Sequence, residues 1–167
     1  MADETTLRHA LPLIAAGQAQ KEMTHNEALA RLDMLVMAAA IDLADIPPAD
    51  PVAGECWIVG QSPTGAWSDS AGKLAGWTPN GWRYADPREG MTVWLIASQC
   101  VAAWRQGLWR VGEVTATALH IGGQQVVGAR QDAIPAPTGG ANPDAEARVA
   151  IDRILDALKA HGLVATA

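Results

Sequence analysis

The pattern of apolar and polar residues predicts a helix early in the chain. Apolar side chains recur at helical spacing between residues 24 and 46. A Thr24-x-x-Glu27 pair stands at the start, and such a pair satisfies free amides of a first helical turn. Ile46-Pro47-Pro48 ends the segment, because proline has no amide hydrogen to donate and crowds the preceding turn. We therefore expect helix 1 over residues 24–46.

A second helix is predicted over residues 144–162, where Asn142 is expected to cap, Pro143 to occupy the first turn and Gly162 to end the helix. Its apolar positions are spaced 4, 3 and 4 residues apart, at Ala147, Ile151, Ile154 and Leu158. That spacing is typical of a coiled-coil seam, and a helix this short is not stable alone in water. We expect an oligomer interface with these members: Leu29, Leu32, Ile151, Ile154 and Leu158.

The middle of the chain predicts short antiparallel strands. Within the β domain expected over residues 54–111, the candidate strands are 56–60, 73–77, 82–85, 91–97, 101–104 and 108–111. Pro79-Asn80-Gly81 and Arg105-Gln106-Gly107 supply turn residues. A β extension of one or two strands is expected over 112–131, and a Pro- and Gly-rich linker over 132–143. The predicted fold class is α+β.

A duplication runs through this β domain. The stretch Trp77-Thr78-Pro79-Asn80-Gly81-Trp82-Arg83 reappears 27 residues later as Trp104-Arg105-Gln106-Gly107-Leu108-Trp109-Arg110. Upstream, Gly54-Glu55-Cys56-Trp57-Ile58-Val59 is echoed by Gly90-Met91-Thr92-Val93-Trp94-Leu95-Ile96. Six of the seven tryptophans fall in the repeat, with Trp67 outside it, so the domain is predicted to consist of two related, tryptophan-based units.

The position of the indoles decides between two interpretations of these units. In the first, the tryptophans fill the β core, and the members assigned there are Trp57, Trp77, Trp94 and Trp104. In the second, one indole per hairpin is exposed and stacks on a sugar ring beside an arginine. The glycan-binding candidates in that case are Trp82, Trp109, Arg83 and Arg110, since each of these tryptophans follows a turn.

Charge and cysteine content narrow the function classes. The chain has 12 Lys and Arg against 18 Asp and Glu, a formal net charge of −6, and no basic stripe. Nucleic acid is therefore not an expected partner, because its phosphates are bound by clustered basic side chains.

The longest apolar stretch, residues 34–41, is too short for membrane insertion. Cys56 and Cys100 are predicted to be free thiols, with a disulfide between the two units as the alternative.

Catalytic and metal chemistry find little support in the residue pattern. The four histidines are scattered, without the spacing of metal ligands or a nucleophile placed beside them, so no metal and no cofactor are expected. Paired carboxylates near the tryptophan hairpins are what a glycosidase needs, and the candidates are Asp69, Asp86 and Glu89. Because loop carboxylates are usually solvated, the chain is predicted not to be an enzyme, with glycan cleavage kept as a weaker rival.

Residues 1–23 have no apolar period and contain Pro12 and Gly17. A polar segment before a helix is often extended. We expect it to be an anchoring arm that contacts a neighbouring subunit or a capsid.

Two segments near the start of the chain are specific enough to compare with known families: Leu11-Pro12-Leu13-Ile14-Ala15-Ala16-Gly17-Gln18-Ala19-Gln20-Lys21 and Thr24-His25-Asn26-Glu27-Ala28-Leu29. They resemble the family of unknown function DUF2793. Further similarity lies in Gly54-Glu55-x-Trp57-Ile58-Val59, Gly81-Trp82-Arg83 and Pro87-Arg88-x-Gly90. The resemblance extends over about residues 11–111 and, less closely, over the C-terminal helix, but not over residues 112–143.

The resemblance implies a structural protein of a tailed phage or of a gene transfer agent, a virus-like particle of bacteria. The expected role is a head spike or tail-fibre component that attaches to host capsule polysaccharide. It would be made in the bacterial cytoplasm and displayed on the particle surface. Expected partners are capsid or tail proteins and further copies of itself, as a trimer, or as a pentamer at a fivefold vertex. The rival is an assembly adaptor without a ligand; an SH3-like cell-wall-binding module is a variant of the first role.

Overall fold

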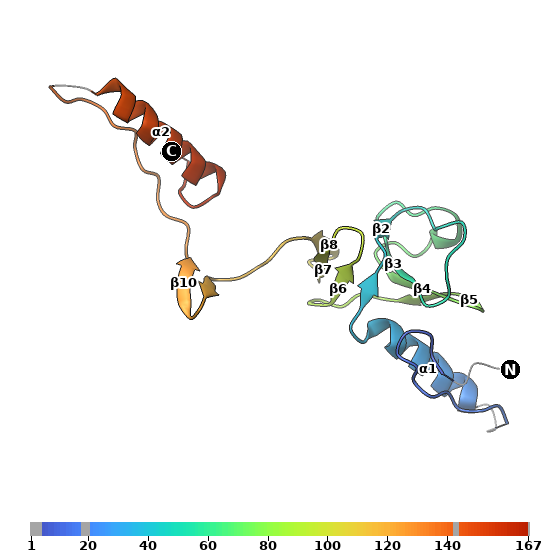
Figure 1. Ribbon diagram of the computed structural model, residues 1–167. Helices are drawn as coiled ribbons and strands as arrows, with labels where there is room; N and C mark the ends of the chain where they lie inside the picture. Colours follow the sequence, from blue (N-terminus) through green and yellow to red (C-terminus); the bar gives the residue numbers. More distant parts are fainter. Residues whose placement is uncertain (1–4, 18–20, 142–143, 167) are drawn as a thin grey trace. The chain divides into compact units, whose positions relative to one another are not determined.

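The computed structural model describes residues 5–17, 21–141 and 144–166. The chain divides into two compact bodies, an N-terminal body of residues 1–113 and a C-terminal body of residues 114–167. Figure 1 shows the elements of both in chain order. Helices and small, mostly antiparallel sheets together make an α+β fold, as predicted.

The N-terminal body contains one helix and two four-stranded sheets. Its elements are α1 (Lys21–Leu35), β1 (Ala39–Ala40), β2 (Leu43–Ala44), β3 (Cys56–Val59), the 3-10 turn η1 (Gly65–Trp67), β4 (Leu74–Thr78), β5 (Gly81–Ala85), β6 (Thr92–Leu95), β7 (Cys100–Arg105) and β8 (Leu108–Val111). The first sheet has the order β2-β3-β4-β5, and the second sheet has the order β1-β6-β7-β8. In each, a two-residue strand runs parallel to the first strand of an antiparallel meander.

Backbone hydrogen bonds show that the two sheets are copies of one unit. The amide of Gly54 donates to the carbonyl of Trp77 at 2.9 Å, and that of Gly90 donates to Trp104 at 3.0 Å. The tryptophan pairs Trp77–Trp82 and Trp104–Trp109 lie directly opposite each other in their hairpins. The predicted duplication is therefore present in the backbone pairing.

The upstream part of the repeat aligns differently from the sequence echo. Trp57 lies opposite Ala75, and its counterpart opposite Ala102 is Val93, not Trp94. The spacing from Gly90 to Trp94 is one residue longer than the spacing from Gly54 to Trp57. Because side chains alternate between the two faces of a strand, a shift of one residue places the tryptophan on the other face. Trp94 is consequently exposed, and the expectation that it fills the core is wrong.

Helix α1 ends well before the predicted boundary at residue 46. It covers Lys21–Leu35, and Met37 has a left-handed φ of 46°. The apolar residues that follow form β1 and β2, which add one strand to each sheet and leave Ala40 fully buried. Thr24 lies inside the helix and does not cap it, because α1 begins at Lys21. The helical spacing of the apolar residues did not reveal where the helix ends and the strands of the two sheets begin.

The second sheet covers one face of the first. Ile58 and Leu74 of the first sheet are packed with Val93, Leu95 and Trp109 of the second in one buried cluster. The opposite face of the first sheet forms a second cluster, in which Trp67 fills the space over Trp57, Val59 and Ala75. The segment that carries Trp67, inserted between β3 and β4, therefore closes this outer side.

The N-terminal segment folds onto its own helix in the described part, residues 5–17. The buried side chain of Asp33 in α1 accepts hydrogen bonds from Thr6 and from the amides of Arg8 and His9. Asn26 accepts from the amide of Ile14 and donates to its carbonyl. The predicted arm of residues 1–23 is thus held along α1 here, and residues 21–23 belong to the helix; residues 1–4 and 18–20 lie outside the description.

The C-terminal body consists of a hairpin and a helix. The predicted extension forms β9 (Leu119–Ile121) and β10 (Gln124–Val127), and the helix α2 covers Ala145–Ala160. Asp144 caps α2 by accepting from the amide of Ala147 at 2.8 Å; the predicted cap Asn142 and Pro143 lie outside the described residues. Gly162 follows α2 with φ 70°, and the amides of Gly162 and Leu163 donate to Lys159 and Leu158, which confirms the predicted stop.

Candidate functional site

Most indoles pack against one another. Around Trp67, which is fully buried, the ring centroids of Trp57 and Trp82 lie 6.5 and 5.1 Å away, and Trp77 lies 4.9 Å from Trp82. These rings meet edge to face or tilted, as aromatic side chains do in cores. The tryptophans of the first unit therefore serve mainly to build that unit.

Trp109 is not an exposed platform. It is 9% exposed, and its indole N–H donates to the carbonyl of Gly72 at 2.8 Å, inside the contact between the two sheets. Trp104 packs against it with a centroid separation of 5.4 Å. The expectation that Trp109 faces a ligand is corrected, because the second sheet needs a large side chain to fill its contact with the first.

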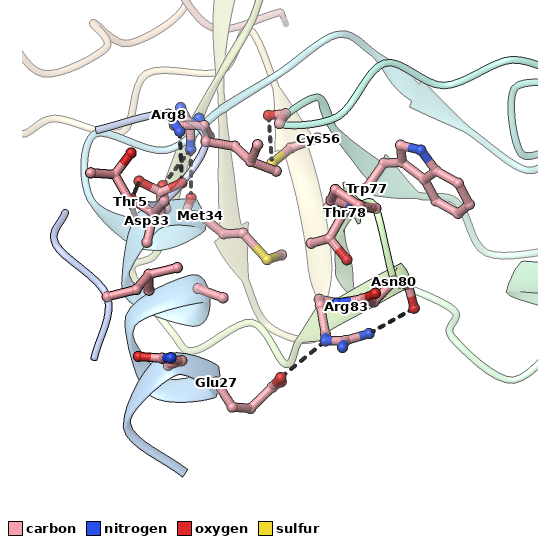
Figure 2. Close-up of a pocket in the computed structure, with 18 of the residues that line it drawn as sticks. Thr5, Arg8, Glu27, Asp33, Met34, Cys56, Trp77, Thr78, Asn80 and Arg83 are labelled. Carbon is pink, nitrogen blue, oxygen red and sulfur yellow. Dashed lines mark hydrogen bonds and ion pairs between the residues drawn. The ribbon is translucent and has the colours of Figure 1, made fainter. Parts of the chain in front are cut away.

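The predicted quartet does not form one surface. Trp82 is half-buried among the aromatic rings of the first unit. Arg83 points toward α1, where its Nε donates to Glu27 at 3.0 Å, as Figure 2 shows. Arg110 lies on the second sheet, on the face opposite to Trp109. Neighbouring residues in a strand point to opposite faces, so each Trp-Arg pair of the repeat is divided between two sides of its sheet.

Trp94 is the exposed tryptophan among the described residues. Its relative exposure is 46%, and it lies opposite Val101 on β7, which is 43% exposed. Thr92 and Ala103 form the next pair on this side, and Arg110 lies opposite Ala103 on β8. We call this side of the second sheet the Trp94 face, with these members: Thr92, Trp94, Ile96, Val101, Ala103, Arg105, Leu108 and Arg110.

The duplication explains why the Trp94 face is apolar and open. Its counterparts in the first sheet, Ile58 for Trp94 and Leu74 for Val101, are fully buried because the second sheet covers them. The second sheet has the same apolar face, but the described residues of the N-terminal body leave it uncovered, and Ile96 and Leu108 are 50% and 39% exposed. The Trp94 face thus resembles in composition the buried face of the first sheet, but it is exposed.

Arg110 gives the Trp94 face a charged group. It is partly exposed, and within the described ranges no ion pair or hydrogen bond engages its guanidinium. Arg83, its counterpart in the first unit, is paired with Glu27. An indole, small side chains and an available guanidinium on one flat face can contact a ring and an anion together.

A hollow of about 640 Å³ lies between α1, the N-terminal segment and the β4–β5 hairpin (Figure 2). Its polar side chains largely satisfy one another. Arg83 binds Glu27 and the carbonyl of Asn80, and Arg8 donates to the carbonyls of Asp33 and Met34. Trp77 is turned away from α1. With its donors and acceptors engaged, the hollow has the character of a structural joint and offers few free groups to a ligand.

Asp33 is the most strongly engaged carboxylate of this joint. Burial raises its pKa, but hydrogen bonds from the Thr6 hydroxyl at 2.7 Å and from the amides of Arg8 and His9 outweigh burial and lower the pKa overall. The nearby Cys56 thiol has the opposite shift, because burial raises its pKa to about 11. Both groups are held in inert forms near neutral pH, with Asp33 ionised and Cys56 protonated.

The candidate catalytic carboxylates have separate local partners. Asp86 pairs with Lys73 at 3.3 Å, Glu89 accepts from the amide of Gln106 at 3.0 Å, and Asp69 is exposed. Cys56 and Cys100 are free thiols. Among the described residues, no three His, Cys, Asp or Glu side chains gather as metal ligands do, and none of the helices found there is long and apolar enough to cross a membrane.

Sequence reasoning missed Trp94 and chose Trp109. The available signal was the alternation along this strand, which places Trp94 on the sheet face opposite to Val93 and Leu95 and so allows it to be exposed while they are buried.

A search of curated proteins finds no match to this chain. A family model described as a protein of unknown function, DUF2793, matches residues 25–110. This match includes both tryptophan units and just over half of the chain, which therefore belongs to the DUF2793 family.

Proposed function

We propose that this protein is a structural component of a virus-like particle, as a head spike or fibre of a gene transfer agent or phage, and that it attaches the particle to host surface glycan. The resemblance of the chain to phage and gene-transfer-agent proteins supports the particle role. The observation that supports the attachment role best is the exposed Trp94 on the same face as Arg110, whose guanidinium has no partner among the described residues. The site proposed from the structure therefore replaces Trp82 and Trp109 by Trp94.

The proposed contact follows from the layout of the second sheet. Trp94 on β6 and Arg110 on β8 are separated by one strand and offset by two residues along the sheet, so their backbones stand about 12 Å apart by ordinary strand geometry. A sugar ring stacked on the indole would place a neighbouring ring over Val101 and Ala103 and an acidic group within reach of Arg110. The net charge of −6 repels an anionic glycan overall, so electrostatic attraction is confined to the neighbourhood of Arg110. Added salt screens this local attraction, and it should therefore reduce the difference in affinity between the natural sequence and Arg110→Gln.

Calorimetric titration with purified capsule polysaccharide tests the site. We expect saturable binding by the natural sequence, loss of at least tenfold in affinity in Trp94→Ala, and a smaller, salt-dependent loss in Arg110→Gln. Arg88→Gln is the matched control, because it removes the same charge from an exposed position outside the Trp94 face. Equal binding by Trp94→Ala and the natural sequence would exclude this site.

A second candidate is an assembly adaptor without a glycan ligand. It is favoured by the aliphatic side chains around Trp94, since Ile96, Val101 and Leu108 are each at least 39% exposed and suit a protein partner. If the folded protein binds no glycan but Trp94→Ala lowers its incorporation into particles, the adaptor role replaces the attachment role.

A further inference from the structure

The C-terminal body exposes apolar side chains that its own core does not use. Within residues 114–141 and 144–166, the buried apolar side chains are those of Leu155 and Val164. By contrast, Ile151 and Ile154 of α2 are 43% and 59% exposed. So small a core does not stabilise a helical body by itself, because isolated helices of this length are marginal in water.

Exposed and partly exposed apolar residues form a continuous seam along α2. In heptad terms Ile151 and Leu158 take position a, and Ala147 and Ile154 take position d. One flank of the seam is used within the chain, where Leu155 is buried. The other flank carries Ala150 and Ala157, whose small side chains let a neighbouring helix approach closely.

The distribution of charge indicates what covers the seam. The charged residues Asp152, Arg153 and Asp156 lie at positions b, c and f, on the side away from it. Arg148, which flanks the seam, is bound to the carbonyls of Pro137 and Gly139. A seam without charge matches an identical seam, because no like charges meet when copies are placed side by side.

We propose that α2 binds the α2 helices of other copies of this chain, and that at least three copies form a parallel bundle. Isoleucine at both core positions favours three or more helices over two. Copies arranged around one rotation axis bring their helices together in parallel, as the heptad rules require. Such a bundle would display several Trp94 faces on one assembly, which raises avidity for a repetitive ligand, but the proposal does not depend on that ligand.

The test is the mass of the full-length protein in solution, measured by light scattering after size exclusion. One chain has a mass of 17.5 kDa, so we expect about 52 kDa or more. Ile154→Asp and the milder double substitution Ile151→Ala, Ile154→Ala should both shift the mass to that of a monomer. Val149→Asp is the matched control, because Val149 is 49% exposed on the same helix but lies at position f, opposite the seam, and it should leave the mass unchanged.

Circular dichroism and the melting temperature of the N-terminal body establish that each variant is folded. A natural sequence that is monomeric or dimeric would overturn the proposal. So would a larger assembly whose mass is the same in the natural sequence and in both seam variants, since the contact would then lie elsewhere. Because the readout is mass and uses no glycan, failure here leaves the attachment proposal standing, and failure of glycan binding leaves the bundle standing.

Discussion

At the scale of single residues, Asp33 organises the start of the chain. Its side chain is 4% exposed and accepts three hydrogen bonds from the segment Thr6–His9. Arg8 in turn donates to two carbonyls at the end of α1, where the helix leaves such groups without partners. One carboxylate therefore joins an otherwise irregular segment to a helix end, because each buried donor finds an acceptor there.

Replacing Asp33 by Asn is expected to destabilise the fold by about 2–3 kcal/mol near pH 7, since hydrogen bonds to a charged acceptor are lost and an amide N–H₂ group meets a backbone donor. The pKa of Asp33 is lowered in the fold, so its contribution is present above the unfolded pKa of about 4 and is lost as pH falls through the folded pKa. The stability difference between Asp33→Asn and the natural sequence should therefore shrink below about pH 4.

Urea unfolding at several pH values measures this difference. Asp50→Asn, at an exposed position, is the control and should change stability little. A cost that stays constant from pH 7 to pH 3 would show that ionisation of Asp33 is not its source.

At the scale of elements, the contact between α1 and the first sheet depends on a missing side chain. A Cβ added at Gly76 would lie 2.8 Å from the Met34 sulfur and 3.0 Å from the two carbons bonded to it. Met34 itself is 4% exposed and belongs to the main core cluster. The equivalent position in the second sheet is Ala103, opposite Arg110, on the sheet face that the described residues of the N-terminal body leave uncovered. Gly76 therefore distinguishes the first unit, against which α1 packs, from the second unit.

Gly76→Ala is expected to cost about 1–3 kcal/mol, because the added methyl group overpacks the α1 contact. Met34→Ala would make room, so the double variant should lose less than the two single variants together. Thermal unfolding provides the comparison, with Ala103→Gly as the control that changes the counterpart position and is expected to cost about 0.5–1 kcal/mol. Strict additivity of Gly76→Ala and Met34→Ala would mean that this contact does not limit the helix position.

At the scale of the whole molecule, the core is concentrated in the N-terminal body. Both buried clusters, including the fully buried Trp67, Ile58 and Leu74, lie within residues 1–113. The C-terminal body has few buried side chains and an exposed helical seam. We therefore expect stability to come mainly from the N-terminal body, whereas the proposed association uses the C-terminal body.

The fragment 1–113 is therefore expected to fold cooperatively, with a melting temperature within a few degrees of that of the full chain at low protein concentration. The reason is that its buried apolar clusters need no residue from 114–167. Scanning calorimetry and amide NMR spectra of the fragment measure this. A fragment that is unfolded, or that melts far below the full chain, would show that the two bodies depend on each other for stability.

The sequence by itself determined the local structure of most of the β domain. Alternating apolar residues and turn residues identified all six strands of the two meanders, and the duplicated Trp-x4-Trp-Arg predicted two related units. Gly162 marked the end of α2 correctly, since a left-handed residue after a helix is a local requirement. These features depend on neighbours along the chain, so a single sequence contains them.

Only the tertiary structure decided which faces are covered. The short strands β1 and β2 could not be told from a continued helix, because their apolar residues gain burial only once both sheets are in place. Trp109 is buried and Trp94 exposed because the second sheet packs on the first through one face alone. The same local motif therefore gives a core residue or a surface residue according to long-range packing, which periodicity along the chain does not encode.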